Sequence, residues 1–292
     1  MILVSDFRQL ALLIRLPNSF TVIANIVAAS LIGSQGHIDL TVFFILLLAS
    51  LCFYHGGMVL NDCLDIAEDK LTQPHRPLVS GKISTSFAWI LATVLMGVAT
   101  LLPLLLSQAV FLVAVLLAIS IVAYNFSPRE SLFGCVLMGA CRSLNWLLPL
   151  VAFGTWKEYA PYAFLVGIYV MSLTFLSRDE NYADRRWLVV LSVSSLLLGG
   201  IYFLWAFDSE SPFYWFKCAI VVAGLLLLFA KIMQLLKDYR PENIRAVVMF
   251  FIIGMIPLDA CLVFVAGYYW QAIFLLALII PSKLLARRLY VT

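Results

Sequence analysis

The feature that most constrains this chain is a succession of apolar runs, most of them close to twenty residues long. A run of about 20 apolar residues can cross the hydrocarbon core of a bilayer as an α-helix. Hydrophobic residues make up 63% of the 292 residues and charged residues only 12%, which excludes an ordinary soluble domain. The sequence therefore predicts an all-α, polytopic transmembrane bundle. The predicted segments are 17–35, 40–60, 84–106, 109–126, 132–153, 160–177, 188–207, 214–236, 245–266 and 268–286.

Lysine and arginine indicate the orientation of these segments. They gather at the N-terminus and in every second connection, whereas the opposite connections hold only Lys157 and Lys217. The positive-inside rule then places both termini in the cytosol and makes the number of helices even. We expect about ten helices, with nine as the alternative because only a short break at Gly267 separates the last two segments. The expectation is one domain over residues 1–292, in a bacterial inner membrane, with membrane lipid around it and no nucleic-acid partner.

An acidic motif, NDCLDIAED at 61–69, follows the second apolar segment. Asp62, Asp65 and Asp69 are spaced i, i+3 and i+7, which places three carboxylates on one face if the helix is continuous. Like charges at this spacing repel each other and favour a cation between them. Mg²⁺ suits them because it takes oxygen ligands and completes its shell with water and substrate phosphates. The motif therefore predicts a magnesium-dependent diphosphate site.

A second acidic patch, SRDENYADRR at 177–186, lies on the same predicted side of the membrane. Glu180 and Asp184 are spaced i and i+4, so we expect them to share a helix face. Neighbouring arginines such as Arg178 are suited to bidentate binding of diphosphate oxygens. Alternatively, the patch is a solvated loop stabilised by local ion pairs.

Two charged residues lie inside apolar segments. Arg142, with Asn145 nearby, is near the cytosolic end of the fifth segment. Because a charge within a span usually faces the protein interior, we expect Arg142 to face an active cavity; the alternative is snorkelling to the interface. Asp259 in the ninth segment is expected to pair with a donor inside the bundle.

These motifs resemble those of the UbiA superfamily of intramembrane prenyltransferases. Residues 61–69 match NDxxDxxxD in full, and HRPLVSGKIS at 75–84 follows them as in the family. Residues 180–184 give ExxxD where the family has DxxxD after its sixth helix. The stretches 15–18 (RLPN) and 124–129 (YNFSPR) are also similar to family motifs, so the resemblance covers nearly the whole chain.

The resemblance implies an enzyme that transfers a prenyl group from a polyprenyl diphosphate to a hydrophobic acceptor, with Mg²⁺ as cofactor and release of pyrophosphate. The acceptor class, aromatic or lipid-like, stays open. The implied active cavity opens near the cytosolic interface. Its metal-binding and catalytic carboxylates are Asp62, Asp65, Asp69, Glu180 and Asp184. The candidate substrate-binding residues are Asn18, Asn61, Arg76, Tyr124, Arg129, Arg142, Asn145 and Arg178.

Two departures from the family pattern indicate a divergent branch, with some similarity to the EboC-like group. Glu180 replaces an aspartate, and its longer side chain can still bind Mg²⁺. The ten expected helices also exceed the family's usual nine. Two other functions remain open, a transporter of lipids or metabolites and a catalytically silent scaffold. Transporters usually place polar residues near the bilayer midplane, so carboxylates at one interface favour chemistry on an amphiphile's head group.

Overall fold

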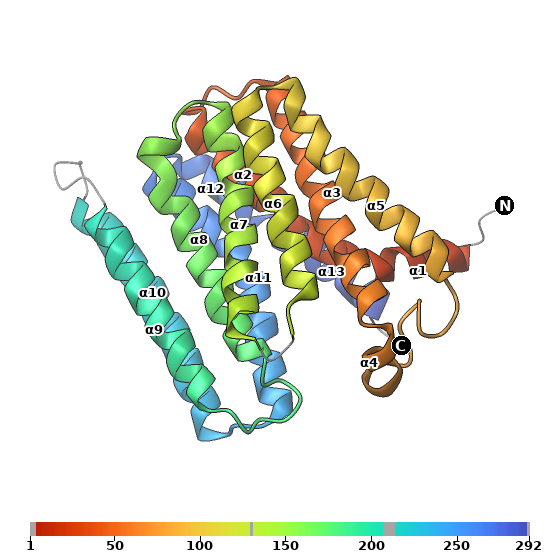
Figure 1. Cartoon of the computed structure of the whole chain (residues 1–292). Coiled ribbons are helices and arrows are strands. Elements are labelled where there is room, and N and C mark those ends of the chain that lie inside the picture. The colour runs from red at the N-terminus through yellow and green to blue at the C-terminus, as the bar shows by residue number, and fades with distance from the viewer. Residues whose placement is uncertain (1–3, 129–130, 207–213, 291–292) are drawn as a thin grey trace.

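The computed structural model describes residues 4–128, 131–206 and 214–290, and every regular element within these ranges is a helix (Figure 1). The first helices are α1 (Val4–Leu13), η1 (Leu16–Asn18), α2 (Ser19–Gly33), α3 (Leu40–Leu64), α4 (Ile66–Thr72), α5 (Thr85–Leu101) and η2 (Leu102–Leu105). They are followed by α6 (Gln108–Phe126), α7 (Leu132–Ala152), α8 (Trp156–Ser177), α9 (Trp187–Trp205), α10 (Tyr214–Lys237), α11 (Pro241–Val265), α12 (Tyr269–Leu276) and α13 (Ile279–Tyr290). The predicted all-α fold is confirmed.

In the described ranges, nine helical stretches are long and apolar enough to cross a membrane, which confirms a polytopic transmembrane bundle. They coincide with the first nine predicted segments. The tenth predicted segment, 268–286, is divided between α12 and α13, with a turn at 277–278. Pro281 explains the break, because a proline cannot donate a hydrogen bond to the carbonyl four residues earlier, and its ring clashes with that carbonyl.

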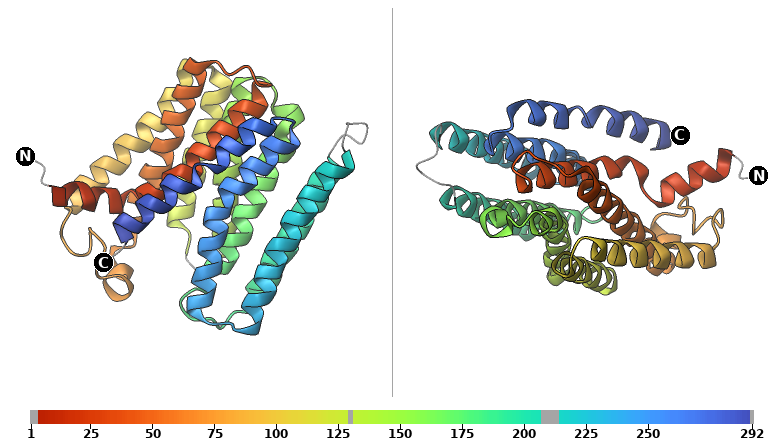
Figure 2. Two further views of the ribbon diagram at one scale, coloured as in Figure 1. Left: turned by 180° about the vertical axis from the view of Figure 1, so that it is seen from behind. Right: turned by 90° about the horizontal axis from the view of Figure 1, so that it is seen from above.

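α13 brings the C-terminal part of the chain back to the N-terminal part (Figure 2). Arg8 Nη2 donates a hydrogen bond to the carbonyl of Leu289 at 3.3 Å, and Ser282 Oγ donates one to the carbonyl of Pro17 at 3.2 Å. α1 and the end of α13 therefore lie on the same face of the bundle. Their location in the cytosol remains a prediction.

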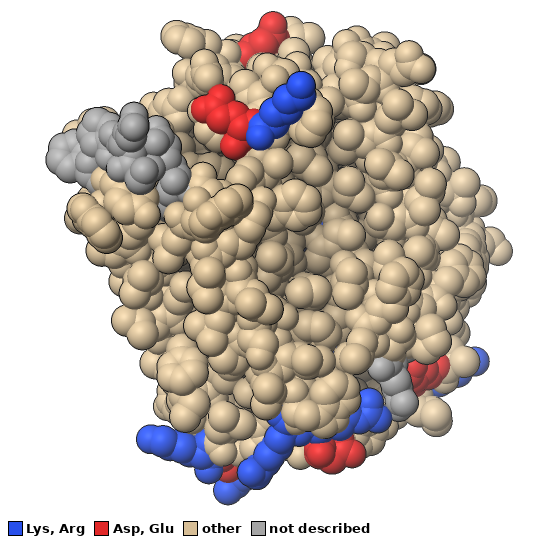
Figure 3. Space-filling view, turned by 60° about the vertical axis from the view of Figure 1, so that its left-hand side comes forward, with Lys and Arg blue, Asp and Glu red and all other residues tan. Residues whose placement is uncertain are grey.

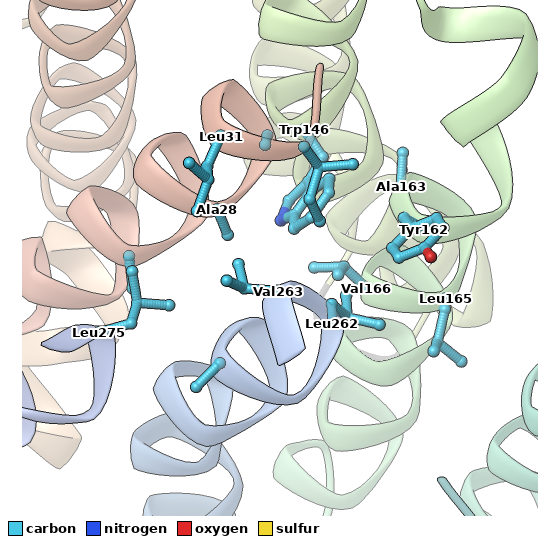
Figure 4. Packing of buried hydrophobic residues seen from close by; sticks show 14 of the residues in the cluster. Ala28, Leu31, Trp146, Tyr162, Ala163, Leu165, Val166, Leu262, Val263 and Leu275 are labelled. Carbon is cyan, nitrogen blue, oxygen red and sulfur yellow. The ribbon is translucent and has the colours of Figure 1, made fainter. Parts of the chain in front are cut away.

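Charged and apolar side chains are distributed as in a protein that spans a bilayer. Figure 3 shows the charged side chains of one face gathered at the two ends of the molecule, with an uncharged band between them. Large apolar side chains on α5, α6 and α10 point outward; Val94, Leu116 and Leu226 are 54%, 53% and 61% exposed. Inside, Trp146 of α7 is fully buried among residues of α2, α8, α11 and α12 (Figure 4).

α7 and α8 approach closely because both carry glycine where they meet. A Cβ atom added at Gly139 would lie 2.7 Å from the carbonyl oxygen of Gly167. A Cβ added at Gly167 would lie 1.9 Å from Ser143 Oγ. Small residues at helix crossings let backbones pack closely in membranes, where no hydrophobic effect drives helices together. This contact fixes α7, which carries one wall of the cavity described below.

Replacing Gly139 with alanine should destabilise the bundle, because the new methyl group would meet backbone rather than a movable side chain. We expect a loss of about 1–3 kcal/mol in the free energy of unfolding, as for overpacked cores. Unfolding in mixed detergent micelles measures it. Gly97→Ala on α5 is the matched control, since nothing lies within 4 Å of its added Cβ. Equal stability of the two variants would show that α7 and α8 do not depend on this contact.

Candidate active site

The first acidic motif forms the junction of two helices. α3 ends at Leu64 and α4 begins at Ile66, so Asp65 occupies a bend with φ −88° and ψ 4°. The amide of Asp65 still donates to the carbonyl of Asn61, and the amide of Asp69 donates to the carbonyl of Asp65. The expected continuous helix is therefore wrong at Asp65. Aspartate favours such helix ends because its short polar side chain competes with helical hydrogen bonds.

Arg76 nevertheless brings two of the three carboxylates together. Its Nη1 atom lies 3.3 Å from Asp62 Oδ1 and also contacts Asp69 Oδ2. Asp62 is 4% exposed and Asp69 1% exposed. Two buried anions can be accommodated only with close cations, because burial of an unpaired charge is very costly. The arrangement is thus a pair of buried carboxylates that converge on one positive group.

Arg15 supplies a second cation, and the sequence analysis assigned it no binding role. Its Nη2 atom lies 3.2 Å from Asp62 Oδ1. Arg15 has φ 51° and ψ 49°, the left-handed region that a long side chain rarely adopts. Such strain persists where surrounding contacts impose it, and it often marks functional sites. The sequence signal was the stretch 15–18, which the analysis used only as a family motif.

A cavity lies between α2, α3, α6 and α7, next to the carboxylates. It encloses about 620 Å³ of empty space, including its open part. Ser50, Tyr54 and Met58 line it from α3 at i, i+4 and i+8, and Asp62 continues this stripe by one more turn. The other lining residues are Val22, Phe53, Gly57, Leu117, Ile121, Tyr124, Asn125, Met138, Cys141, Arg142 and Asn145. The cavity is therefore mainly apolar, and its lining on α3 reaches to within about one helical turn of the first acidic motif.

The second acidic motif lies in the loop between α8 and α9. α8 ends at Ser177, and residues 178–186 form turns and irregular chain, with Ala183 at φ 55°. The expected shared helix face of Glu180 and Asp184 is therefore wrong. Asp184 is largely exposed, with its side chain 65% accessible and 3.7 Å from Arg185.

Asp179 organises this loop, although the sequence analysis did not select it. It is fully buried, and its carboxylate accepts hydrogen bonds from the amides of Asp184 at 3.1 Å and Arg185 at 2.8 Å. Tyr239, between α10 and α11, donates a third at 2.6 Å. These contacts replace the expected helix, because a carboxylate that accepts backbone amides stabilises a turn instead.

The same contacts shift the acidity of both partners. Burial alone would raise the pKa of the Asp179 carboxyl, but the bonds from Tyr239 and the two amides outweigh it and hold this pKa below its usual value. Burial and the Asp179 bond raise the pKa of Tyr239. The guanidinium of Arg186 lies 5.5 Å from the Tyr239 ring. Asp179 is therefore held as an anion that accepts hydrogen bonds in this loop.

Arg178 connects the second loop to the cavity. Its guanidinium carbon lies 5.8 Å from the centroid of Tyr124, which lines the cavity. Gly134 leaves room for it, since an added Cβ there would lie 2.6 Å from Arg178 Nη2. Arg178 Nε is buried and has no hydrogen-bond partner within the described ranges. A cationic donor therefore lies next to Tyr124, a residue that lines the cavity.

The other candidate residues are placed as follows. Arg142 and Asn145 line the cavity, in the orientation expected for Arg142. Asn61 lies at the last turn of α3, and Asn18 precedes α2 without capping it through its side chain. Arg129 lies outside the described residues.

The oxygen donors fit a hard divalent cation in kind, because Mg²⁺ prefers carboxylates. Asp62 and Asp69 already converge on a positive group, Arg76. In the described part of the chain, however, no three histidine, cysteine, aspartate or glutamate side chains are close enough to form a metal site. The carboxylates of the two motifs are thus not gathered as the sequence led us to expect.

Comparison with known families gives one extensive match. The model of the UbiA prenyltransferase family matches residues 22–254. A digeranylgeranylglyceryl phosphate synthase of Saccharolobus solfataricus is 27% identical over 152 residues, covering 48% of this chain and 54% of that protein. A 4-hydroxybenzoate octaprenyltransferase of Legionella pneumophila is 23% identical over 254 residues, covering 76% and 88%. The chain spans about half the length of the first curated relative it matches.

Solved structures show the same fold. One, from work on digeranylgeranylglyceryl phosphate synthase in membranes, has a TM-score of 0.69 at 19% identity and covers 90% of this chain and 99% of the other. A UbiA homolog from Archaeoglobus fulgidus, bound to DMAPP and Mg²⁺, has a TM-score of 0.64 at 14% identity and covers 86% and 99%. These likenesses establish the architecture of this chain.

Replacing Asp179 with alanine should loosen the second loop, because two backbone amides and one phenol lose their acceptor. A hydrogen bond to a charged group contributes about 1.5–3 kcal/mol, so we expect amide exchange at 180–186 to accelerate by roughly tenfold or more. Hydrogen–deuterium exchange in nanodiscs measures it. Asp238→Ala is the control, because that exposed carboxylate contacts Arg240 and Asn243 at the neighbouring α10–α11 turn. Unchanged exchange in Asp179→Ala would contradict the assigned role.

Proposed function

Because the chain belongs to the UbiA prenyltransferase family, we propose that it transfers a prenyl group from a polyprenyl diphosphate to a hydrophobic acceptor, releasing pyrophosphate. The observation that carries the proposal is an apolar cavity that lies next to two buried carboxylates on α3 and α4. A diphosphate can bind to carboxylates through a divalent cation, and an isoprenoid chain needs an apolar enclosure. The two requirements meet at the end of α3.

The charge balance of the site supports a metal-dependent reaction. Asp62 and Asp69 are balanced by Arg15 and Arg76, so the four groups together are close to neutral. A diphosphate brings several further negative charges, which buried groups of zero net charge cannot compensate. Mg²⁺, held by Asp62, Asp65 and Asp69 and in our proposal also by Glu180 and Asp184, would supply that positive charge and polarise the departing pyrophosphate.

The residues of this chain then have separate roles. Arg76 and Arg178 bind diphosphate oxygens, and Arg129, Asn61 and Asn18 are further candidates for this contact. The bond between the prenyl C1 atom and the bridging oxygen breaks, and its electron pair leaves with the pyrophosphate. A nucleophilic atom of the acceptor forms the new bond to C1 and loses a proton.

The cavity protects the electron-poor prenyl group from water. Its walls are mainly apolar, and a closed apolar site prevents hydrolysis of a reactive intermediate. Tyr54 and Tyr124 line it, and an aromatic face stabilises a nearby cation. We therefore assign the prenyl transfer to the part of the cavity next to Asp62.

The names of the curated relatives point to two classes of molecule. One set is named for the synthesis of a glyceryl phosphate lipid, its product, and the other for 4-hydroxybenzoate. We propose that the acceptor of this chain is likewise hydrophobic, either aromatic or lipid-like. We further propose that the diphosphate end faces the cytosol, on the side where Arg15, Lys70 and Arg185 concentrate positive charge.

Pyrophosphate release in nanodiscs tests the proposal. Purified protein is offered geranyl or geranylgeranyl diphosphate and a panel of phenols and lipid alcohols, with Mg²⁺ or with EDTA. We expect release that needs the metal and falls by roughly 100-fold or more in Asp62→Asn, since the loss of one electrostatic contact to the leaving group has effects of this size. Glu68→Gln is the matched control, because Glu68 is an exposed carboxylate of the same acidic motif, on the short helix α4.

Two results would contradict the proposal. Full activity of Asp62→Asn would show that the reaction does not need the carboxylate of Asp62. The absence of metal-dependent binding of any prenyl diphosphate would favour the scaffold or the transporter.

A further inference from the structure

The end of the cavity far from the first acidic motif carries hydrogen-bond donors that an isoprenoid chain cannot use. Asn145 is 7% exposed and Ser50 1% exposed. Asn145 Nδ2 and Ser50 Oγ have no hydrogen-bond partner in the described ranges, although both residues line the cavity. Arg142 lines the same region. Ser50 lies twelve residues before Asp62 on α3, so this end is about 18 Å from the first acidic motif.

A chain of buried hydrogen bonds holds Arg142 in place. Its Nη1 atom donates a hydrogen bond to Asn25 Oδ1 at 2.6 Å, and Asn25 Nδ2 donates to Asp259 Oδ2. Trp146 Nε1 donates to the other oxygen of Asp259 at 3.2 Å. Asn25, Trp146 and Asp259 are fully buried and come from three helices, α2, α7 and α11. The Asn25 amide is therefore fixed with its oxygen toward Arg142, which leaves the other N–H groups of the guanidinium available to the cavity.

The hydrogen-bond donors at this end of the cavity determine which ligand group can bind there. A hydrocarbon tail would leave Asn145 Nδ2 and Ser50 Oγ without partners and would offer none to the N–H groups of Arg142 that do not bind Asn25, and each lost hydrogen bond costs free energy. Arg142 and Asn145 Nδ2 are donors, and the Ser50 hydroxyl can also donate. Asp259 counterbalances the charge of Arg142 through Asn25, so a large anion is not required. An oxygen that accepts hydrogen bonds, in a carbonyl or a carboxylate, satisfies all three groups.

We propose that Arg142, Asn145 and Ser50 form an acceptor-recognition subsite that binds a carbonyl or carboxylate oxygen at the end of the acceptor remote from its nucleophile. Asn25 and Asp259 are positioning residues that aim Arg142 into this subsite. The inference rests on the proposed function, because it assigns the acceptor to the end around Ser50 and the diphosphate to the carboxylate end of one cavity. It narrows the acceptor to compact molecules with a polar oxygen group at the far end.

The test measures acceptor binding without donor or metal, so it does not depend on turnover. Three phenols that carry a carboxylate, a carboxamide or a methyl group in the para position are titrated into the full-length protein in nanodiscs. We expect the carboxylate or the carboxamide to bind at least roughly tenfold more tightly than the methyl compound. The comparison of the first two shows whether charge or carbonyl oxygen is recognised.

Variants then show which residues cause the difference in affinity between the phenols. Arg142→Met should reduce the ratio of affinities toward one, and Arg142→Lys should restore part of it. Asp259→Asn should lower the ratio without changing the affinity for the methyl compound, which a merely structural defect would not do. Arg8→Met is the matched control, since that guanidinium binds the carbonyl of Leu289 far from the cavity. Thermal unfolding of each variant identifies any that do not fold.

Equal binding of the three phenols by the wild-type protein, or no binding of any of them, would overturn the subsite. So would an unchanged ratio in Arg142→Met. Geranyl diphosphate binding with Mg²⁺ is measured on the same samples. If the donor binds and the phenol ratio is one, only the subsite fails; if the donor does not bind, the proposed function fails.

Discussion

The contact between Arg76 and the two buried carboxylates, Asp62 and Asp69, is the interaction on which the rest of the site depends. It joins the end of α3, the short helix α4 and the connection that follows, and Arg15 adds the turn between α1 and η1. Without these cations the burial of two carboxylates at 4% and 1% exposure would be very costly. Their charge in turn makes the end of α3 a place where a polyanion and a divalent cation can bind together.

The cavity connects this charged end to a different polar environment. Its middle is apolar, with Phe53, Leu117 and Ile121 among its walls, and the end around Ser50 carries donors on α3 and α7. An apolar chain and a polar oxygen group therefore have separate places in one enclosure. The bilayer favours this separation, because the surrounding hydrocarbon cannot satisfy a misplaced polar group.

Sequence patterns predicted what composition and local spacing determine. The first nine spans, the acidic motif and the position of Arg142 on the cavity side of α7 follow from apolar runs and from the cost of a charge in lipid. The break at Pro281 was also readable in principle, since proline interrupts a helix by a local mechanism. The expected tenth span ignored that signal.

Features set by distant contacts could not be read this way. Asp179 shapes the second loop through Tyr239, sixty residues further along the chain, so helical spacing of Glu180 and Asp184 was misleading. Asn25 and Asp259 are separated by 234 residues, and no local pattern pairs them. The left-handed backbone of Arg15 likewise reflects its contact with Asp62, formed only in the folded bundle.

The central claim is that the carboxylate end of the cavity binds a prenyl diphosphate together with Mg²⁺. Equilibrium binding of a non-hydrolysable geranyl diphosphate analogue to the protein in nanodiscs, across a Mg²⁺ titration, tests it most directly. The account predicts saturable binding that appears with Mg²⁺ and disappears with EDTA, because Arg15 and Arg76 only balance Asp62 and Asp69. Binding that is equally tight without metal, or no binding at any Mg²⁺ concentration, would contradict it.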